Sequence, residues 1–189
     1  GLIPKPLPYG VGQKLPKGSD LVMQIHYHRT GKEERDRTRI GLYFCKNEVR
    51  SHFMAIPVPG LFFSIPAGRK DYKIDSTIKL TEDVFAHWMV PHMHLLGKDI
   101  ELIAYFPDGK ELSLIKIPEW DYNWQEMYQF KEPLKLPKDT VLRIRATYDN
   151  SEDSPLNPHS PPRNVMIGEQ TTNEMCFVFV GVSSSKPGW

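Results

Sequence analysis

His92 and His94 are the two residues of this sequence whose types and spacing are best suited to metal chemistry. Only Met93 separates them, and they end an apolar run that predicts a β-strand. Residues i and i+2 of a strand point to the same face, so both imidazoles can reach one ion. Imidazole binds copper, zinc, iron and nickel, and the pair alone therefore selects no metal. Two exposed histidines that alternate by chance would give the same pattern.

Met175 is a third candidate ligand, although no spacing in the sequence joins it to the two histidines. A thioether is a soft ligand that selects Cu(I) over harder ions. Met175 follows the polar, turn-like segment 168–174 and begins a predicted strand. Functional residues often lie where a rigid element meets a loop. Core packing is the ordinary role of methionine, and the residues alone leave both roles open.

Several other polar and aromatic residues deserve comparison with this set. Glu169 and Glu174 precede Met175 and could orient a metal ligand, but solvated turn carboxylates are the simpler interpretation. The aromatic-rich segment 120–125 could line a substrate or carbohydrate cleft, or could equally cap the core. Three further histidines lack a partner at metal-ligand spacing, and we interpret them as surface or structural residues: His52, His87 and His159.

The elements that must position these residues are short strands. The 17 prolines and 13 glycines are spread along the chain, which argues against long helices. Segment 71–80 alternates apolar and polar residues with the period of two typical of a half-buried strand. The turn 107–110, Pro-Asp-Gly-Lys, predicts a hairpin. The predicted strands are 21–28, 39–44, 71–80, 85–94, 100–106, 112–117, 127–130, 141–148 and 175–182.

This pattern predicts an all-β chain built as an antiparallel β-sandwich of the jelly-roll form. The segment 57–60, Pro-Val-Pro-Gly, separates two parts. We interpret residues 1–55 as the end of a first sandwich, which is only partly present, and residues 56–189 as a second, nearly complete one. The proline-rich segment 150–163 predicts a long loop, and loops of that length often carry function.

Composition sets the broad class of protein. The chain has 189 residues with 40% hydrophobic and 25% charged residues, which is typical of a folded globular protein. A net charge of +1 creates no global field that would attract nucleic acid. No run approaches the roughly 20 apolar residues that span a bilayer. Cys45 and Cys176 both lie among apolar residues; they could form one disulfide or neither, and buried free thiols are the simpler interpretation.

Three segments together resemble a known family. Residues 92–98, His-Met-His-Leu-Leu-Gly-Lys, resemble the H-x-H-x-x-G-K motif of the copper type II, ascorbate-dependent monooxygenases, which include the peptidylglycine α-hydroxylating and dopamine β-monooxygenases. Residues 173–176, Asn-Glu-Met-Cys, are similar to the family's D-E-M-C segment. Residues 21–27, Leu-Val-Met-Gln-Ile-His-Tyr, resemble its L-Q-V-H-Y strand. A Pro-Gly turn in residues 63–68 also matches, and all follow the family's order.

The resemblance implies a ligand set and a reaction. His92, His94 and Met175 would bind the copper at which O2 is activated and a small organic substrate is hydroxylated. His26 would be one ligand of a second copper that transfers electrons from ascorbate, and Gln24 would lie near it. The family fold has two jelly rolls with one copper on each, facing a wet cleft. An extracytoplasmic location, periplasmic or secreted, is also implied.

Departures from the family pattern limit what carries over. The other two ligands of the electron-transferring copper form a His-His pair, and this chain contains none. His28 could add one ligand, or could be an exposed strand residue. We therefore expect the chain to be a C-terminal piece, with an upstream domain or chain that supplies the missing ligands.

The substrate and disulfide positions also differ from the family pattern. Peptide-specific members place an Arg and a Tyr where this chain has Val90 and Phe179, so a carboxylate-ended peptide is not supported as substrate. The partner of the family disulfide is missing near Ala146, and we expect Cys176 to be free or otherwise paired.

Three functional hypotheses follow. The first is a copper monooxygenase domain that is incomplete as an isolated chain. The second is a non-catalytic module of the same ancestry, which binds copper or contacts other modules of a larger protein. The third, weaker one is a zinc or non-haem iron sandwich of the cupin type, which requires a carboxylate in place of Met175.

Overall fold

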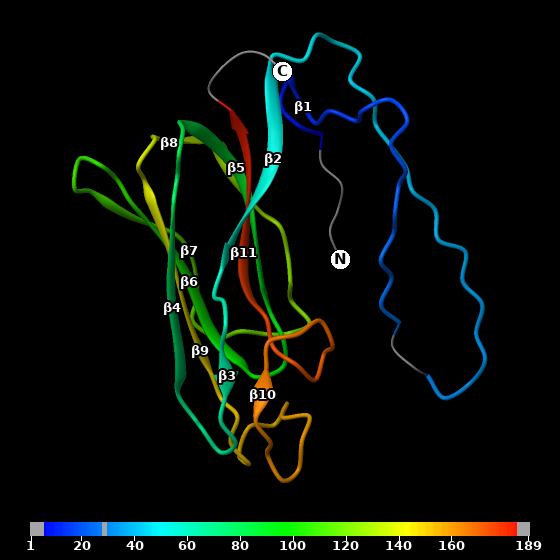
Figure 1. Cartoon of the computed structure of the whole chain (residues 1–189), viewed down its shortest axis with the longest axis vertical. Coiled ribbons are helices and arrows are strands. Elements are labelled where there is room, and N and C mark those ends of the chain that lie inside the picture. The colour runs from blue at the N-terminus through cyan, green and yellow to red at the C-terminus, as the bar shows by residue number, and fades with distance from the viewer. Residues whose placement is uncertain (1–5, 28–29, 185–189) are drawn as a thin grey trace.

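The computed structural model describes residues 6–27 and 30–184, and their fold is a sandwich of two facing β-sheets (Figure 1). The described residues form no helix, and so contain no helix long and apolar enough to cross a membrane. The strands are β1 (Val11–Gly12), β2 (Ser51–Pro59), β3 (Ser64–Ile65), β4 (Tyr72–Lys79), β5 (Val84–Met93), β6 (Gly97–Tyr105), β7 (Glu111–Ile117), β8 (Tyr128–Leu136), β9 (Val141–Tyr148), β10 (Val165–Met166) and β11 (Cys176–Ser184).

The strand order is that of a jelly roll. One sheet has the order β1-β2-β11-β5-β8 and the other has the order β4-β9-β6-β7, while β3 and β10 form a separate small pair. If the eight long strands are renumbered 1 to 8 in chain order, leaving out β1, β3 and β10, the two sheets have the orders 1-8-3-6 and 2-7-4-5. This is the double Greek-key arrangement of a jelly roll. All their pairings are antiparallel. The predicted all-β sandwich is confirmed.

The core lies between the two sheets and follows from the period of two along each strand. On β11, Val178, Val180 and Val182 are buried in the core, whereas Phe177 and Phe179 alternate with them and are only half-buried. Successive strand side chains point to opposite faces, so the two phenylalanines lie on the outer face of the five-stranded sheet. This outer face matters for the site described below.

Two predicted strands are absent, which corrects the prediction for residues 21–28 and 39–44. The described residues between β1 and β2 form no strand, and nearly all are exposed (Figure 1). Val22, Tyr43 and Phe44 are 88%, 92% and 76% exposed. Strand propensity reflects packing against neighbouring strands, and no described strand pairs with these segments. His28 lies outside the described residues.

One long strand, β2, was not predicted, and neither were the two-residue strands β1, β3 and β10. β2 contains Pro57 and Pro59, which the sequence suggested as a boundary, yet it pairs with β11 along its length. On its other edge β2 makes a short parallel contact with β1 at Ser51 and His52, and no further described strand pairs with that edge. Proline is tolerated on such an edge because the missing N–H would face away from the ladder. The predicted division at residues 55 and 56 falls within this strand and stays a prediction.

Candidate metal centre

His92 and His94 lie at the end of β5, where the five-stranded sheet meets its loops. Met89 and Met93 of β5 point into the core, so His92 lies on the outer face, opposite Phe177 of β11. The centroids of the two imidazole rings are 5.1 Å apart and the rings are nearly perpendicular, at 86°. His92 is half-buried and His94 is buried. The predicted proximity of the two rings is confirmed.

The hydrogen bonds of both rings place the proton of the neutral imidazole on Nδ1. His94 Nδ1 lies 3.0 Å from the carbonyl oxygen of Asn173; a carbonyl only accepts, so Nδ1 of the neutral ring carries the proton. His92 Nδ1 lies 2.6 Å from Gln125 Oε1, while Gln125 Nε2 donates to the carbonyl of Tyr122 at 2.8 Å. That second bond fixes the amide so that its oxygen faces His92. In both neutral rings the Nε2 lone pair is therefore available to a metal.

Both imidazoles favour the neutral form that a metal needs. Burial lowers the pKa of His92 below 6.5, opposed by the hydrogen bond to Gln125, and the neighbouring His94 lowers it further. Burial also lowers the pKa of His94, opposed by backbone carbonyls, and the charge of His26 adds to the lowering. A metal competes with a proton for the ring nitrogen, so this environment favours metal binding at neutral pH.

The pairing of β5 with β11 brings Met175 to the same end of the sheet. Met93 faces Cys176 and His92 faces Phe177 in the antiparallel register, so the next residues outward are His94 and Met175. Alternation along β11, continued by one residue, predicts that the Met175 side chain lies on the side of Phe177 and His92. The backbone there is held by the buried Tyr148, whose hydroxyl donates to the carbonyl of Met175 at 2.7 Å.

Glu174 connects the turn after β5 to the segment that leads into β11. The interpretation of it as a solvated turn carboxylate is wrong. Its side chain is fully buried. It accepts hydrogen bonds from the backbone N–H groups of His94 at 2.9 Å and Leu96 at 2.7 Å. Burial raises its pKa to about 7, against these N–H groups, which lower it. The carboxylate thus fixes the turn after His94 to the residue before Met175, and only its position before a candidate ligand signalled this role.

The aromatic segment 120–125 both packs and supports the site. Trp120 is buried and its Nε1–H donates to the carbonyl of His94 at 3.1 Å. A Cβ on Gly97 would lie 2.8 Å from Trp120 Cδ1 and 2.7 Å from Met93 Cε. The Gly of the H-x-H-x-x-G-K segment is therefore required by this close packing. Gln125, at the other end of the segment, holds His92, while Trp124 is 64% exposed.

The segment that contains His26 reaches the same region. Gln24 Nε2 donates to Glu169 Oε2 at 2.9 Å, which connects the segment to the loop before Met175. His26 is exposed and is close enough to His94 for its charge to affect that pKa. The structure therefore places the predicted ligand of the second copper on the same side of the molecule as His92 and His94.

The donor set limits which metals fit. Within residues 6–27 and 30–184, no three His, Cys, Asp or Glu side chains converge on a point that could hold a metal ion. A cupin-type site therefore lacks its carboxylate there, and Glu174, the nearest carboxylate in sequence, already accepts two backbone N–H groups. A site built on the two imidazoles needs a ligand of another kind, and a thioether suits Cu(I).

The remaining predicted candidates lie elsewhere. His87 is buried and its Nε2 lies 2.8 Å from Ser183 Oγ, so its structural role is confirmed. His52 and His159 are both half-buried. Both cysteines are free: Cys176 is buried, and burial raises its pKa to about 11, whereas Cys45 is exposed, which corrects the prediction that it is buried.

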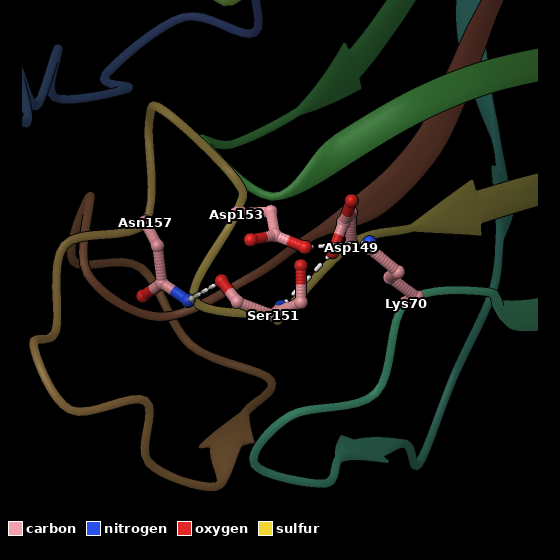
Figure 2. Close-up of polar contacts among 5 residues, drawn as sticks. All are labelled: Lys70, Asp149, Ser151, Asp153 and Asn157. Atoms are coloured by element: carbon pink, nitrogen blue, oxygen red, sulfur yellow. Dashed lines mark hydrogen bonds and ion pairs between the residues drawn. The ribbon is translucent and has the colours of Figure 1, made fainter.

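Hydrogen bonds hold the long loop after β9. Lys70 Nζ donates to Asp153 at 2.6 Å, the Ser151 N–H to Asp149 at 2.9 Å, and Asn157 Nδ2 to the carbonyl of Ser151 at 3.1 Å (Figure 2). Beneath them the fully buried Asn150 donates to the carbonyl oxygens of Ile65, Pro66 and Arg163. These bonds fasten the loop to the turn between β3 and β4.

Comparison with known proteins agrees with the motifs. The family described as copper type II ascorbate-dependent monooxygenase, C-terminal domain, matches residues 63–182. DBH-like monooxygenase protein 1 from Homo sapiens is 24% identical over 181 residues, which cover 85% of this chain and 27% of that protein. Its Mus musculus counterpart is 27% identical over 182 residues, with the same coverage. The chain thus spans about a quarter of the length of these relatives.

Solved structures give only a weak likeness. A structure of the infectious bursal disease virus Gt strain covers 90% of this chain and 40% of its own, at 13% identity and a TM-score of 0.32. A T13 particle of the same virus covers 78% of this chain and 35% of its own, at 10% identity and a TM-score of 0.34. At these scores the likeness carries no argument about function.

Proposed function

Because the chain belongs to the copper type II ascorbate-dependent monooxygenase, C-terminal domain family, we propose that it binds one copper ion through His92, His94 and Met175 and hydroxylates an organic substrate with O2. The observation that supports the proposal most strongly is the hydrogen bonding of the His92 and His94 rings. Each Nδ1 faces an oxygen acceptor, so in both neutral rings, at one end of β5, Nε2 carries a lone pair rather than a proton.

The donor set fits reduced copper. Two neutral imidazoles and a thioether would form a three-ligand set suited to Cu(I). A ligating histidine usually donates its other ring N–H to a carbonyl or amide oxygen, and Asn173 and Gln125 supply those oxygens. Glu174 keeps the backbone of the two ligand-bearing segments together. These contacts would hold the two imidazoles in place before a metal binds.

The proposed reaction needs two electrons from outside the site. Substrate C–H and O2, with two electrons and two protons, give the hydroxylated product and water, while ascorbate is oxidised. Copper, when bound, supplies the redox chemistry for O2 activation. His26 would hold a second, electron-transferring copper together with ligands from an upstream domain or chain, because this sequence has no adjacent histidine pair. An extracytoplasmic location, periplasmic or secreted, fits this use of copper and ascorbate and is part of the proposal.

A non-catalytic role is the second candidate function. One observation favours it: Val22, Tyr43 and Phe44, between β1 and β2, are largely exposed, as expected of a segment that packs against another module. The proposed enzyme and the interaction module differ in one property. Only the enzyme must turn over O2 and ascorbate when the rest of the protein is supplied.

Copper binding by the whole chain tests the site. We expect one Cu(I) per chain, and we expect Met175→Ala to weaken Cu(I) binding more than Cu(II) binding, because a soft ligand is lost. Met166→Ala is the matched control, since Met166 lies on β10 and is 62% exposed. Equal affinity and equal redox potential in the Met175→Ala protein and the unmodified chain would exclude the proposed ligand set.

A further inference from the structure

The turn at which β9 enters the long loop carries three oxygen-bearing side chains at alternate positions. Asp149, Ser151 and Asp153 follow one another as Asp-x-Ser-x-Asp. The first, third and fifth positions of an EF-hand calcium loop have this spacing, with alternate side chains directed to one ion. Ser154 and Ser160 stand where an EF-hand has its glycine and its final glutamate. Because only the first three ligand positions match, the spacing needs independent structural support.

The Ser151 hydroxyl supplies that support. Ser151 is 6% exposed, and its Oγ is buried without a hydrogen-bond partner among the described residues. A buried hydroxyl without a partner is costly, so such a group in a folded protein calls for an explanation, such as an ion. Figure 2 shows this hydroxyl pointing to the side on which the carboxylates of Asp149 and Asp153 lie. Oxygen atoms of all three side chains are therefore directed to one place at the start of the loop.

A positive charge already lies beside these oxygen atoms. Lys70 Nζ donates to Asp153 Oδ2 at 2.6 Å. This hydrogen bond raises the pKa of Lys70, and the charges of Asp153 and Asp149 raise it further. The side chains of Lys70 and Asp153 are 61% and 77% exposed, and ion pairs this exposed contribute little to stability. The lysine can therefore swing into solvent at small cost and leave the carboxylates to a metal ion.

The backbone of the turn is held in place by contacts that do not involve Lys70. The Ser151 N–H donates to Asp149 Oδ1 at 2.9 Å, and the Asp149 N–H donates to the carbonyl of Leu96 at 2.8 Å. Asn157 Nδ2 donates to the carbonyl of Ser151 at 3.1 Å. Binding sites work best when their ligands are positioned in advance by such contacts. An ion at this turn would thus need to move little besides the lysine side chain.

We propose that Asp149, Ser151 and Asp153 bind a calcium ion, which displaces the Lys70 ammonium and fixes the start of the loop. All three donors are oxygen atoms, which suit calcium or magnesium rather than copper or zinc. Calcium accepts irregular sets of oxygen ligands completed by water, whereas magnesium demands octahedral geometry. With only two carboxylates, the Kd should be about 0.1–1 mM, as in weak extracellular calcium sites. The site shares no residue with the candidate copper ligands, so the two proposals stand or fall separately.

Calcium titration of the whole chain, without copper and at constant ionic strength, tests the proposal. Amide NMR should show saturable shifts at Lys70, Ser151 and Asp153, with a Kd of about 0.1–1 mM. The melting temperature should rise with calcium concentration, because the ion binds only the folded chain. Magnesium should bind severalfold more weakly. Shifts that fail to saturate by about 10 mM, ten times the weakest expected Kd, or that are equal for both ions, would overturn the proposal.

Ser151→Ala separates a ligand role from a structural role. Because the hydroxyl has no partner among the described residues, its removal should leave the melting temperature without calcium unchanged or higher. The same variant should bind calcium severalfold more weakly than the unmodified chain, because one of three ligands is lost. Equal calcium affinity in Ser151→Ala and the unmodified chain would show that the hydroxyl is no ligand, and the proposal would fail.

Lys70→Met gives a change of the opposite sign. It removes the competing ammonium and should tighten calcium binding about 2- to 5-fold, a gain that an unfolded variant cannot show. Lys110→Met is the matched control: Lys110 Nζ donates to Asp108 at 2.7 Å in a similarly exposed pair, and the turn 107–110 contains no hydroxyl residue. It should bind calcium like the unmodified chain. No gain in Lys70→Met, or the same gain in both variants, would contradict the proposed site.

Discussion

Gln125 offers the sharpest test of how the candidate metal centre is built. Its side-chain oxygen accepts the Nδ1–H of His92 at 2.6 Å, and its amide nitrogen donates to the carbonyl of Tyr122 at 2.8 Å. Gln125→Ala removes both bonds and frees the imidazole to rotate and to change tautomer. Gln125 touches no metal position itself, so any loss of copper affinity must act through the orientation of His92.

The expected loss can be estimated from these contacts. One such hydrogen bond contributes about 0.5–1.5 kcal/mol net, and the loss of ring orientation adds to it. Outer contacts of this kind change metal affinity about 10- to 100-fold, or about 1.4–2.7 kcal/mol. We therefore expect Gln125→Ala to weaken Cu(I) binding 10- to 100-fold. The free energy of unfolding should fall by only about 1–2 kcal/mol, because Gln125 is half-buried.

Competition with a chromophoric Cu(I) chelator measures the affinity, and imidazole 15N NMR of the metal-free chain reports the His92 tautomer. The unmodified chain should carry its proton on Nδ1, whereas Gln125→Ala should show a mixture of tautomers. Gln129→Ala is the matched control, since Gln129 is exposed on β8 and should change neither result. A folded Gln125→Ala protein with unchanged Cu(I) affinity would refute the reasoning.

Three further predictions concern stability. Gly97→Ala should lower the free energy of unfolding by about 1–3 kcal/mol, because the new Cβ meets Trp120; in denaturant titrations Gly41→Ala, with nothing within 4 Å, should have no such effect. Burial holds the pKa of His87 below 6.5, so the native state binds fewer protons than the unfolded one and stability falls as pH drops below 6.5. Denaturant titrations at several pH values should find a shallower fall in His87→Gln, and identical slopes would contradict this. Asn150→Ala leaves three carbonyl oxygens without their donor. It should lower the free energy of unfolding by about 2–4 kcal/mol and therefore lower the melting temperature. An unchanged melting temperature would count against this account of the loop.

Much of the fold could be predicted from local patterns. Apart from the two-residue β10, the strands from β4 onward were predicted within a few residues at most ends, because alternation with a period of two can be recognised from neighbouring residues. β8 runs to Leu136, farther than expected. β2 was missed because its two prolines suggested a break. They are acceptable because no described strand pairs with them on the edge of β2 that faces away from β11. The segment before it was over-predicted, since strand propensity cannot indicate whether a partner strand exists.

The candidate site likewise has some features that the sequence predicts and others that only the structure shows. The spacing of His92 and His94 was enough to place both imidazoles together, because residues i and i+2 share a face wherever the strand lies. Three features depend on contacts between distant segments: the burial of Glu174, the fixing of the two rings by Gln125 and Asn173, and the position of Met175, just before Cys176, opposite the end of β5. Periodicity is a property of adjacent residues, whereas register and burial exist only once the strands have paired, and so the tertiary structure alone decided them.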